Sequence, residues 1–517
     1  MDGSSGSGGQ AVWSIGGTVT GLNGSITLQN NGGDDITLDA DGPFTFETPL
    51  EEGSAYAVTA SEIPGVQLCV IDHAEGDIAG DVSDVLVRCG NKAILEARDA
   101  DSGYEPWITD GTDEGTFRLG DLNEGGGSSN PVTFGGLGGR LVFRARTNPT
   151  GQELWSTDGT VEGTAPLAEL NPGVLDANPY PAGVLDGLLY LQHRGALWVT
   201  DGQPEGIMEE FYDPEPAGTS SATGAAVADG FIAFVAQVGA EREPWVTDGT
   251  EAGTMPLGDL NPLGGSDPEF FPRAVGGNVY FTAVGEAGRE LWVTDGTPEG
   301  TEQVLDIQPG IVGSNPVISG WLGDRVMFSA NMPDDGVEPF ISDGTRGGTV
   351  YLGNLDESFL SSEPLGFRPF GDVALFRAAV GGVGRELWRS DGTPEGTELL
   401  LDINEGAADG FPSGLLVQPA NPSPDADPWG VFPANDGVAG PELWGTDGTA
   451  DGTGMLLEIV PGGAGGNPGG YQPVGPDLVV FFANNPGEGC EPFITDGTEE
   501  GTVALAPINP GAGDSCN

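Results

Sequence analysis

The stretch ELWVTDGTPEGT, residues 290–301, decides the fold because related copies of it recur along the chain. A degenerate copy, ALWVTDGQPEGI, starts at Ala196 and brings the number of copies to nine. Such recurrence predicts an array of equal supersecondary units. The other copies are EPWITDGTDEGT at 105–116, ELWSTDGTVEGT at 153–164, EPWVTDGTEAGT at 243–254, EPFISDGTRGGT at 338–349, ELWRSDGTPEGT at 386–397, ELWGTDGTADGT at 442–453 and EPFITDGTEEGT at 491–502.

The turn aspartate of each copy sets the length of the repeat. These aspartates follow one another at intervals of about 48 residues, which suits a four-stranded blade of a β-propeller. The period is too long for a leucine-rich repeat, and the helices of ankyrin and tetratricopeptide repeats are missing. The nine positions are Asp110, Asp158, Asp201, Asp248, Asp295, Asp343, Asp391, Asp447 and Asp496.

One unit divides into four strands on the residues alone. Between residues 271 and 307 the segments FPRAVGG, NVYFTAVG, RELWVTDGT and GTEQVLDI are short, largely apolar and bounded by turn residues. Alternation in NVYFTA and ELWVT places every second side chain on one face, as in sheets that pack against neighbouring sheets. The Asp-Gly pair supplies the turn between the third and fourth strands.

A recurrent aromatic residue follows the start of each copy and predicts the contact between blades. Tryptophan and phenylalanine exchange at this position within one chain, which favours a packing role over ligand stacking. We therefore expect an all-β, nine-bladed β-propeller with one aromatic wedge per blade. The wedge residues are Trp107, Trp155, Trp198, Trp245, Trp292, Phe340, Trp388, Trp444 and Phe493.

These copies resemble the bacterial ELWxxDGT-repeat, or hyalin-like repeat, proteins, and the resemblance covers residues 91–510. It implies an exported or surface-attached protein. Proline variants of the motif, the missing glutamate at Ala196, and Gln203 and Ile207 in the third copy depart from the pattern. These departures put in doubt that all nine blades have the same role.

The segment before the repeats reads as a separate small domain. Residues 12–90 contain short strand-like runs, including SIGGTVTG, FTFETPL and DVLVRC, and resemble the Ig-like or prealbumin-like sandwich modules of bacterial surface proteins. That resemblance implies a spacer or adhesion unit. We expect residues 1–11 to form a flexible Gly/Ser tail and residues 91–517 to form the propeller. The first copy starts at residues 92–98 without an obvious first strand.

Four cysteines predict two disulfides within domains. Four cysteines permit three connectivities, and their positions favour Cys69 with Cys89 and Cys490 with Cys516. We expect Cys490 in the loop before the third strand of the last blade and Cys516 in the tail that follows that blade. Disulfides imply an oxidising compartment, so the chain is expected to be secreted or on the cell surface.

Charge excludes one class of partner. The chain holds 17 Lys+Arg against 79 Asp+Glu, for a formal net charge of −62. Nucleic acid is therefore not expected as a partner. No apolar run is long enough for a transmembrane segment.

Motifs of hydrolase, P-loop or dinucleotide chemistry are missing, so we expect no enzyme and no cofactor. Calcium is the alternative at the nine turn aspartates, because clustered oxygens attract hard cations. The simpler interpretation is that each aspartate accepts hydrogen bonds from turn amides. The glutamate that starts most copies could line a polar ring with Arg289 and Arg385, but surface ion pairs are the preferred interpretation.

Loops on one face of the propeller differ between copies, among them residues 147–152, 262–268, 284–289 and 331–337. Variable loops on a rigid ring suit recognition. The leading hypothesis is a non-catalytic extracellular protein for adhesion, matrix or surface assembly, or recognition of a glycan or protein. The alternatives are a glycosidase or lyase with carboxylates at the central channel, and a self-assembling, filament-forming structural protein.

Overall fold

The computed structural model describes residues 12–22, 26–38, 40–62, 67–171, 173, 175–194, 196–213, 224–356, 361–410, 414–418, 428–474, 478–511 and 513–516. Within these residues all regular structure is β-strand. The expected tail at residues 1–11 lies outside the described residues. No described helix has the length and apolar character that crossing a membrane requires.

The N-terminal residues form two four-stranded sheets around one core. The core contains Ile15, Val19, Leu28, Phe44 and Val87, all nearly inaccessible to solvent. A disulfide joins Cys69 to Cys89, as predicted from the sequence, across neighbouring strands of one sheet. The sheets are β5(Gly42–Thr45)-β2(Ile15–Thr20)-β10(Val82–Asn91)-β8(Gln67–Asp72) and β4(Asp34–Leu38)-β3(Ile26–Asn30)-β7(Ala55–Glu62)-β9(Glu75–Asp77), with a short pair β1(Val12–Trp13)-β6(Leu50–Glu51).

Each sequence repeat forms one antiparallel unit, and we number these units along the chain. Unit 1 has three strands and the others have four; a single bridge between β22 and β26 joins units 4 and 5 into one sheet. The strands are β11(Ala93–Ala97), β12(Glu105–Thr109), β13(Phe117–Arg118) in unit 1; β14(Val132–Leu137), β15(Arg140–Thr147), β16(Gly151–Thr157), β17(Ala165–Ala168) in unit 2; β18(Tyr180–Leu185), β19(Leu188–His193), β20(Ala196–Thr200), β21(Met208–Tyr212) in unit 3; β22(Ala225–Ala228), β23(Phe231–Val238), β24(Glu241–Thr247), β25(Met255–Pro256) in unit 4; β26(Glu269–Val275), β27(Asn278–Gly285), β28(Gly288–Thr294), β29(Glu302–Leu305) in unit 5; β30(Val317–Leu322), β31(Arg325–Met332), β32(Gly336–Ser342), β33(Val350–Tyr351) in unit 6; β34(Leu365–Phe370), β35(Val373–Val380), β36(Gly384–Ser390), β37(Thr397–Leu401) in unit 7; β38(Leu416–Gln418), β39(Trp429–Asn435), β40(Pro441–Thr446), β41(Gly454–Leu457) in unit 8; and β42(Gly469–Pro473), β43(Val479–Asn485), β44(Gly489–Thr495), β45(Val503–Ala504) in unit 9.

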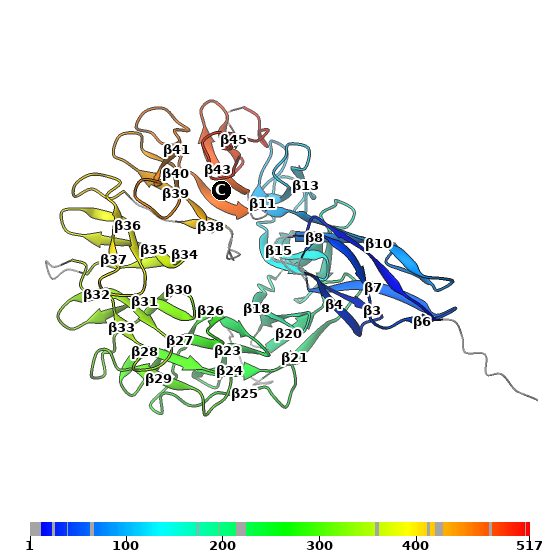
Figure 1. Ribbon diagram of the computed structural model, residues 1–517, viewed down its shortest axis with the longest axis horizontal. Coiled ribbons are helices and arrows are strands. Elements are labelled where there is room, and N and C mark those ends of the chain that lie inside the picture. The colour runs from blue at the N-terminus through cyan, green and yellow to red at the C-terminus, as the bar shows by residue number, and fades with distance from the viewer. Residues whose placement is uncertain are drawn as a thin grey trace, which may run out of the picture.

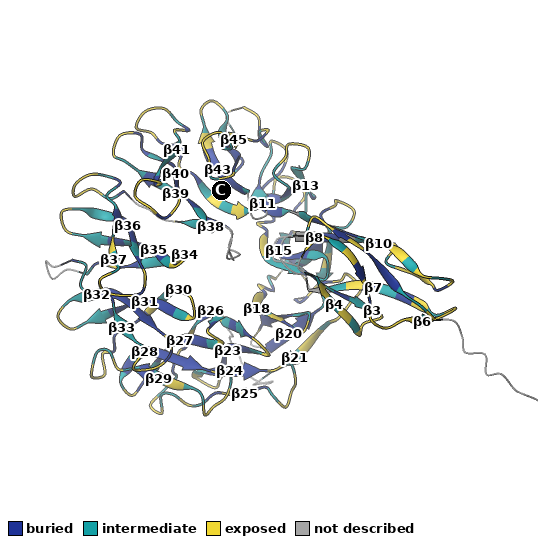
Figure 2. Cartoon of the chain, in the orientation of Figure 1, coloured by how far each residue is buried: buried dark blue, intermediate teal, exposed yellow. Residues whose placement is uncertain are grey.

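The units follow one another around a central opening in a propeller-like ring (Figure 1). The first strand of units 2 to 9 lies nearest the opening, and the later strands lie further out. Buried residues concentrate along the second and third strands, whereas the outer turns are exposed (Figure 2). The N-terminal sheets lie outside the ring, beside β15.

The predicted aromatic wedges lie between consecutive units. Trp388 of unit 7, for example, packs in one core with Met327 and Ile341 of unit 6 and with Phe376 of its own unit. Comparable cores join the other neighbours, and each wedge residue belongs to or packs against one of them. The packing interpretation of the recurrent aromatic residue is therefore confirmed.

Unit 9 packs against unit 1 and closes the ring, which the sequence left unexplained. Leu95 and Ala97 of β11 share a core with Val480 and Ile494 of unit 9. The amide of Ala506 donates a hydrogen bond of 2.7 Å to the Asp113 carboxylate, 393 residues away in the chain. The closing interface thus uses the same apolar packing as the interfaces inside the array.

The second disulfide, Cys490 to Cys516, holds the C-terminal segment at this closing interface. The pairing agrees with the sequence prediction, but the predicted place of Cys490 is wrong, because this residue lies inside β44 and not in the loop before it. Ser515 next to Cys516 accepts a hydrogen bond of 3.0 Å from the amide of Arg98 in unit 1. The disulfide therefore restrains the segment that touches both ends of the ring.

Replacing Trp388 by alanine should lower the free energy of unfolding by about 3–5 kcal/mol, because a large ring between two units is deleted. Trp388→Phe should cost less than about 1.5 kcal/mol, since phenylalanine fills this position in units 6 and 9. Chemical denaturation of both variants checks the expectation. Equal stability of the two variants would show that the ring does not act as a wedge.

Candidate functional site

One position of the inner strand changes its residue type from unit to unit. The first-strand residue that pairs with the third residue of the second strand is glycine in units 2, 3 and 6, at Gly135, Gly183 and Gly320. In unit 7 the same position holds Arg368, opposite Leu375, and in unit 5 it holds Arg273, next to the Ala274–Val279 pair. Two arginines therefore replace small residues on the wall of the opening.

Glycine at this position has a packing reason in unit 6. A Cβ atom on Gly320 would lie 2.1 Å from the carbonyl oxygen of Phe367 in the next unit, closer than real contacts allow. Both arginines, in contrast, are exposed residues of first strands. Units 5 and 7 thus carry a long, charged side chain at the position where glycine lets the backbone of the next unit lie close.

Arg273 lies over an aromatic ring of the neighbouring unit. Its guanidinium carbon is 4.1 Å from the centre of the Trp321 ring, a cation–π geometry. Trp321 also packs near Phe271, with 6.1 Å between ring centres. The Nε of Arg273 also donates to the carbonyl oxygen of Ala274 at 3.5 Å, and no ion pair to Arg273 occurs among the described residues.

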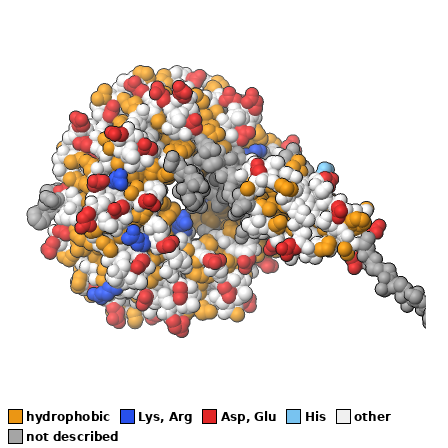
Figure 3. All heavy atoms as spheres, in the orientation of Figure 1, with side chains coloured by type: hydrophobic (Ala, Val, Ile, Leu, Met, Phe, Trp, Pro, Cys, Tyr) orange, Lys and Arg blue, Asp and Glu red, His pale blue; other side chains and the backbone are white. Residues whose placement is uncertain are grey.

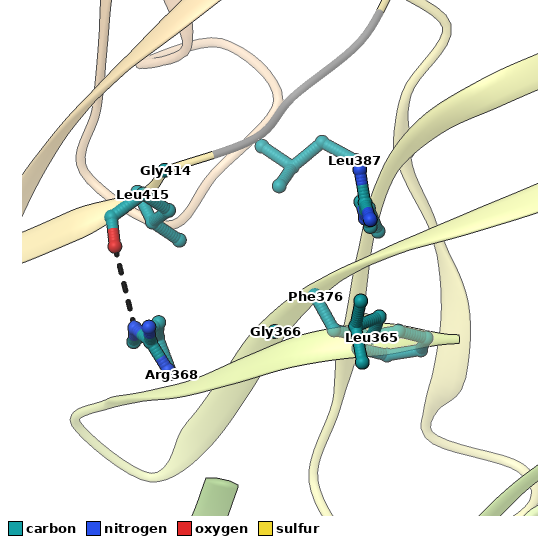
Figure 4. A pocket seen from close by; sticks show the side chains of 8 residues that line it. Leu365, Gly366, Arg368, Phe376, Leu387, Gly414 and Leu415 are labelled. Atoms are coloured by element: carbon teal, nitrogen blue, oxygen red, sulfur yellow. Dashed lines mark hydrogen bonds between the residues drawn. The ribbon is translucent and has the colours of Figure 1, made fainter. Parts of the chain in front are cut away.

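Arg368 connects three units and borders a small pocket. Its Nε donates to the carbonyl oxygen of Leu415 in unit 8 at 3.3 Å, and its Nη1 donates to that of Ser319 in unit 6 at 3.4 Å. Figure 4 shows the bond to Leu415 with Leu365, Phe376 and Leu387 around the pocket. The cavity measures about 170 Å³ and is also lined by Arg377. Two guanidinium groups and an apolar floor suit an anion with an apolar body.

Acidic residues are scarce on the inner strands. Among the described first strands, β14, β18, β22, β26, β30, β34, β38 and β42, the carboxylates comprise Glu269 alone. Figure 3 shows acidic side chains spread over the rim, while basic ones also occur beside the opening. The chain as a whole carries a net charge of −62. Because the first strands hold few carboxylates, a negative group is repelled less at this wall than at the acidic rim.

The repeated glutamate is buried, so its assignment to surface ion pairs or to a polar ring is wrong. Glu386, with no exposed surface, accepts hydrogen bonds from the amides of Ile403 at 2.8 Å and Gly410 at 2.6 Å. Arg289 and Arg385 pair with other acids, Glu269 and Glu363. The same contacts to the following connection recur for Glu105, Glu153, Glu243, Glu290, Glu338, Glu442 and Glu491.

Burial raises the pKa of these glutamates, to about 7 for Glu153 and Glu386. Shifts of this kind often mark catalytic acids. Here desolvation raises the pKa, whereas the hydrogen bonds from backbone amides lower it. Each of these carboxylates accepts a hydrogen bond from the chain that runs to the next unit, so the raised pKa accompanies a structural role; Oε1 of Glu153 is buried without a partner among the described residues.

The turn aspartates have the simpler role that the sequence suggested. In unit 5, Oδ1 of Asp295 accepts hydrogen bonds from the amide and the hydroxyl of Thr297, at 2.9 and 2.7 Å. A Cβ atom on Gly300 would lie 2.1 Å from that oxygen, which explains the second glycine of the motif. The amide contact recurs at Asp110, Asp158, Asp201, Asp248, Asp343, Asp391, Asp447 and Asp496.

Calcium at these turns stays a prediction. In the described part, no three or more acidic, histidine or cysteine side chains are grouped so that they could hold a metal ion. The arginines of the wall were missed by the sequence reasoning. Aligning the first strands of all copies would have found them, because glycine gives way to arginine at one column.

Comparisons with known proteins find no family and only distant structural similarity. No family model and no curated protein matches the chain. Among solved structures, an eukaryotic initiation factor is 10% identical over 83% of this chain and 98% of its own, with a TM-score of 0.47. Dihydro-heme d1 dehydrogenase NirN is 14% identical over 69% of this chain and 71% of its own, with a TM-score of 0.41. TolB from Acinetobacter baumannii is 15% identical over 46% of this chain, with a TM-score of 0.27, and the chain spans 60% of its length.

Replacing Glu386 by alanine should lower the free energy of unfolding by about 2–5 kcal/mol, because two buried amides lose their acceptor.

The pH dependence gives a sharper test with Glu386→Gln. Since the pKa of Glu386 is about 7 in the folded protein and its ordinary value is 4.5, the folded state binds the proton more tightly. Wild type should therefore lose stability relative to this variant as the pH rises from 4.5 to 7. Denaturation curves at several pH values measure the stability of wild type relative to Glu386→Gln. A relative stability of wild type that stays constant or rises with pH would contradict the assignment.

Proposed function

We propose that this protein is a non-catalytic recognition protein of the cell exterior, built as a nine-bladed β-propeller behind an N-terminal β-sandwich. Its binding site is the arginine wall, which we define as Arg273, Trp321, Arg368 and Arg377. The ligand is a glycan in which one sugar carries a carboxylate. The observation that carries the proposal is the replacement of glycine by arginine at one inner-strand position in units 5 and 7.

The architecture supports the first part of the proposal. Nine repeat units with interlocked aromatic wedges suit nine blades, and two sheets around one core suit a sandwich. Two disulfides are consistent with an oxidising compartment. A rigid ring presents side chains from several blades without an entropy cost for ordering them.

The chemistry of the wall supports the choice of ligand. Guanidinium groups bind carboxylates through two parallel hydrogen bonds, and an exposed indole edge or face packs on the C–H surface of a sugar. Arg368 already donates to three backbone carbonyls, those of Leu415, Ser319 and Phe367, which fixes the orientation of its guanidinium. The net charge of −62 opposes a long polyanion, so an isolated carboxylate on a mostly neutral glycan fits best.

Binding to pairs of oligosaccharides that differ by one carboxylate tests the proposal. We expect the acidic member of at least one pair to bind more tightly, and binding to weaken as salt rises. Arg273→Gly with Arg368→Gly restores the residue that the repeat favours and should weaken this binding by about tenfold or more, or about 1.4 kcal/mol. Calorimetry on the purified variants measures the change.

Arg346→Gly is the matched control, because Arg346 lies on an exposed outer turn and the same charge is removed there. This variant should bind as wild type does. Equal binding of neutral and acidic members, or an unchanged affinity of the double variant, would overturn the proposed site. Turnover of the bound glycan would favour the alternative of a carbohydrate-active enzyme.

A further inference from the structure

Unit 1 leaves one strand edge open at the centre of the ring. Its sheet runs β11-β12-β13, so among the described residues β11 has no strand on the side that faces the opening. In the eight other units that side of the second strand is paired with a first strand. An edge of this kind presents backbone donors and acceptors in the pattern that another strand can match.

A groove lies along the open edge. It measures about 640 Å³ and is lined by Ile94, Leu95 and Glu96 of β11. Its two sides come from the first strands of the neighbouring units, with Val132 and Thr133 on one side. On the other side the lining is glycine-rich, at Gly469 and Gly470 of β42. The groove therefore has the floor and both walls that the first strand has in the other units.

The approach to the groove has the geometry that precedes a first strand elsewhere. In units 2, 5, 6 and 7, a serine accepts a hydrogen bond from the second strand, and the first strand begins three residues later. Ser515 makes the same contact to Arg98, at 3.0 Å. A strand that continues the repeat pattern in this groove would run antiparallel to β11, as in the other units.

Glu96 gives the groove a charge preference. It is the charged residue of the lining, and no hydrogen bond or ion pair to it is found among the described residues. Burial raises the pKa of this carboxyl group. The corresponding residue is arginine in unit 2, threonine in unit 5 and serine in unit 6, at Arg144, Thr282 and Ser329. A basic side chain placed opposite Glu96 would compensate a charge that has no ion-pair partner in the described part of the chain.

We propose that this groove binds an extended peptide of another protein by adding it as a strand to β11. The peptide is apolar where the first strands are apolar, and it carries lysine or arginine at the position opposite Glu96. Recognition combines backbone hydrogen bonds with one charged pair. The site is separate from the arginine wall and does not depend on its function.

A second copy of this chain is a less suitable occupant. The first-strand residues at the position that would face Glu96 are Val132, Tyr180, Glu269, Val317, Leu365 and Gly469 in the units where the pairing is seen. None of these residues is basic. The net charge of −62 also opposes close association of two copies and favours a basic partner segment.

A synthetic peptide with the sequence of residues 314–322 tests the proposal when Val317 is replaced by lysine. Its companion carries glutamate at that place. Wild-type protein should bind the lysine peptide about tenfold or more tightly than the glutamate peptide, and Glu96→Lys should reverse the preference. Fluorescence anisotropy measures both affinities, and hydrogen exchange should slow at Ala93–Ala97 when the peptide is bound.

Glu96→Gln keeps the shape of the side chain and serves as a second variant if the lysine variant does not fold. It should remove the preference without abolishing binding. Absence of binding for both peptides, or a preference that Glu96→Gln leaves unchanged, would overturn the proposal. Protection of β42 or β14 without protection of β11 would do the same, because the peptide would then lie outside the edge. Concentration-dependent dimerisation without peptide binding would point to a second copy as the occupant and would equally contradict the proposal.

Discussion

The packing of each sheet face against the next sheet is the constraint on which the rest of this molecule depends. A four-stranded sheet of such short strands exposes two faces and cannot bury them by itself. The aromatic residue of each repeat fills the space toward the preceding unit, and the same kind of core joins unit 9 to unit 1. Closure therefore removes the two exposed faces that an open row of units would leave at its ends.

Buried glutamates fix how one unit leads into the next. The carboxylate of Glu338, on the third strand, accepts hydrogen bonds from Leu355 and Ser362 in the connection that reaches the following unit. These bonds supply acceptors for amides that would otherwise be buried without partners. In units 2, 5, 6 and 7 the first strand then begins three residues after the serine of the connection, so positions in these units can be compared directly. Against that regular background, Arg273, Arg368 and Glu96 stand out as departures that packing does not require.

The sequence predicted what local periodicity encodes. The Trp388 wedge, the turn at Asp295 and the two cysteine pairs follow from residue types and spacing, and the structure agrees with each. The role of Glu386 could not be derived in this way, because its partners Ile403 and Gly410 are 17 and 24 residues away and donate through backbone atoms that leave no mark on residue identity. Arg273 and Trp321 meet across two units, so their contact also depends on the ring.

Cross-linking of unit 1 to unit 9 tests the closed ring most directly. Asp113 and Ala506 lie in hydrogen-bond contact although 393 residues separate them. With both replaced by cysteine, a short bifunctional thiol reagent should join them within one chain, and peptide mass spectrometry should identify the linked pair in dilute protein. The same reagent should fail after denaturation. Absence of the intramolecular link in folded protein, with both thiols reactive, would show that the units form an open row and would contradict the closed ring.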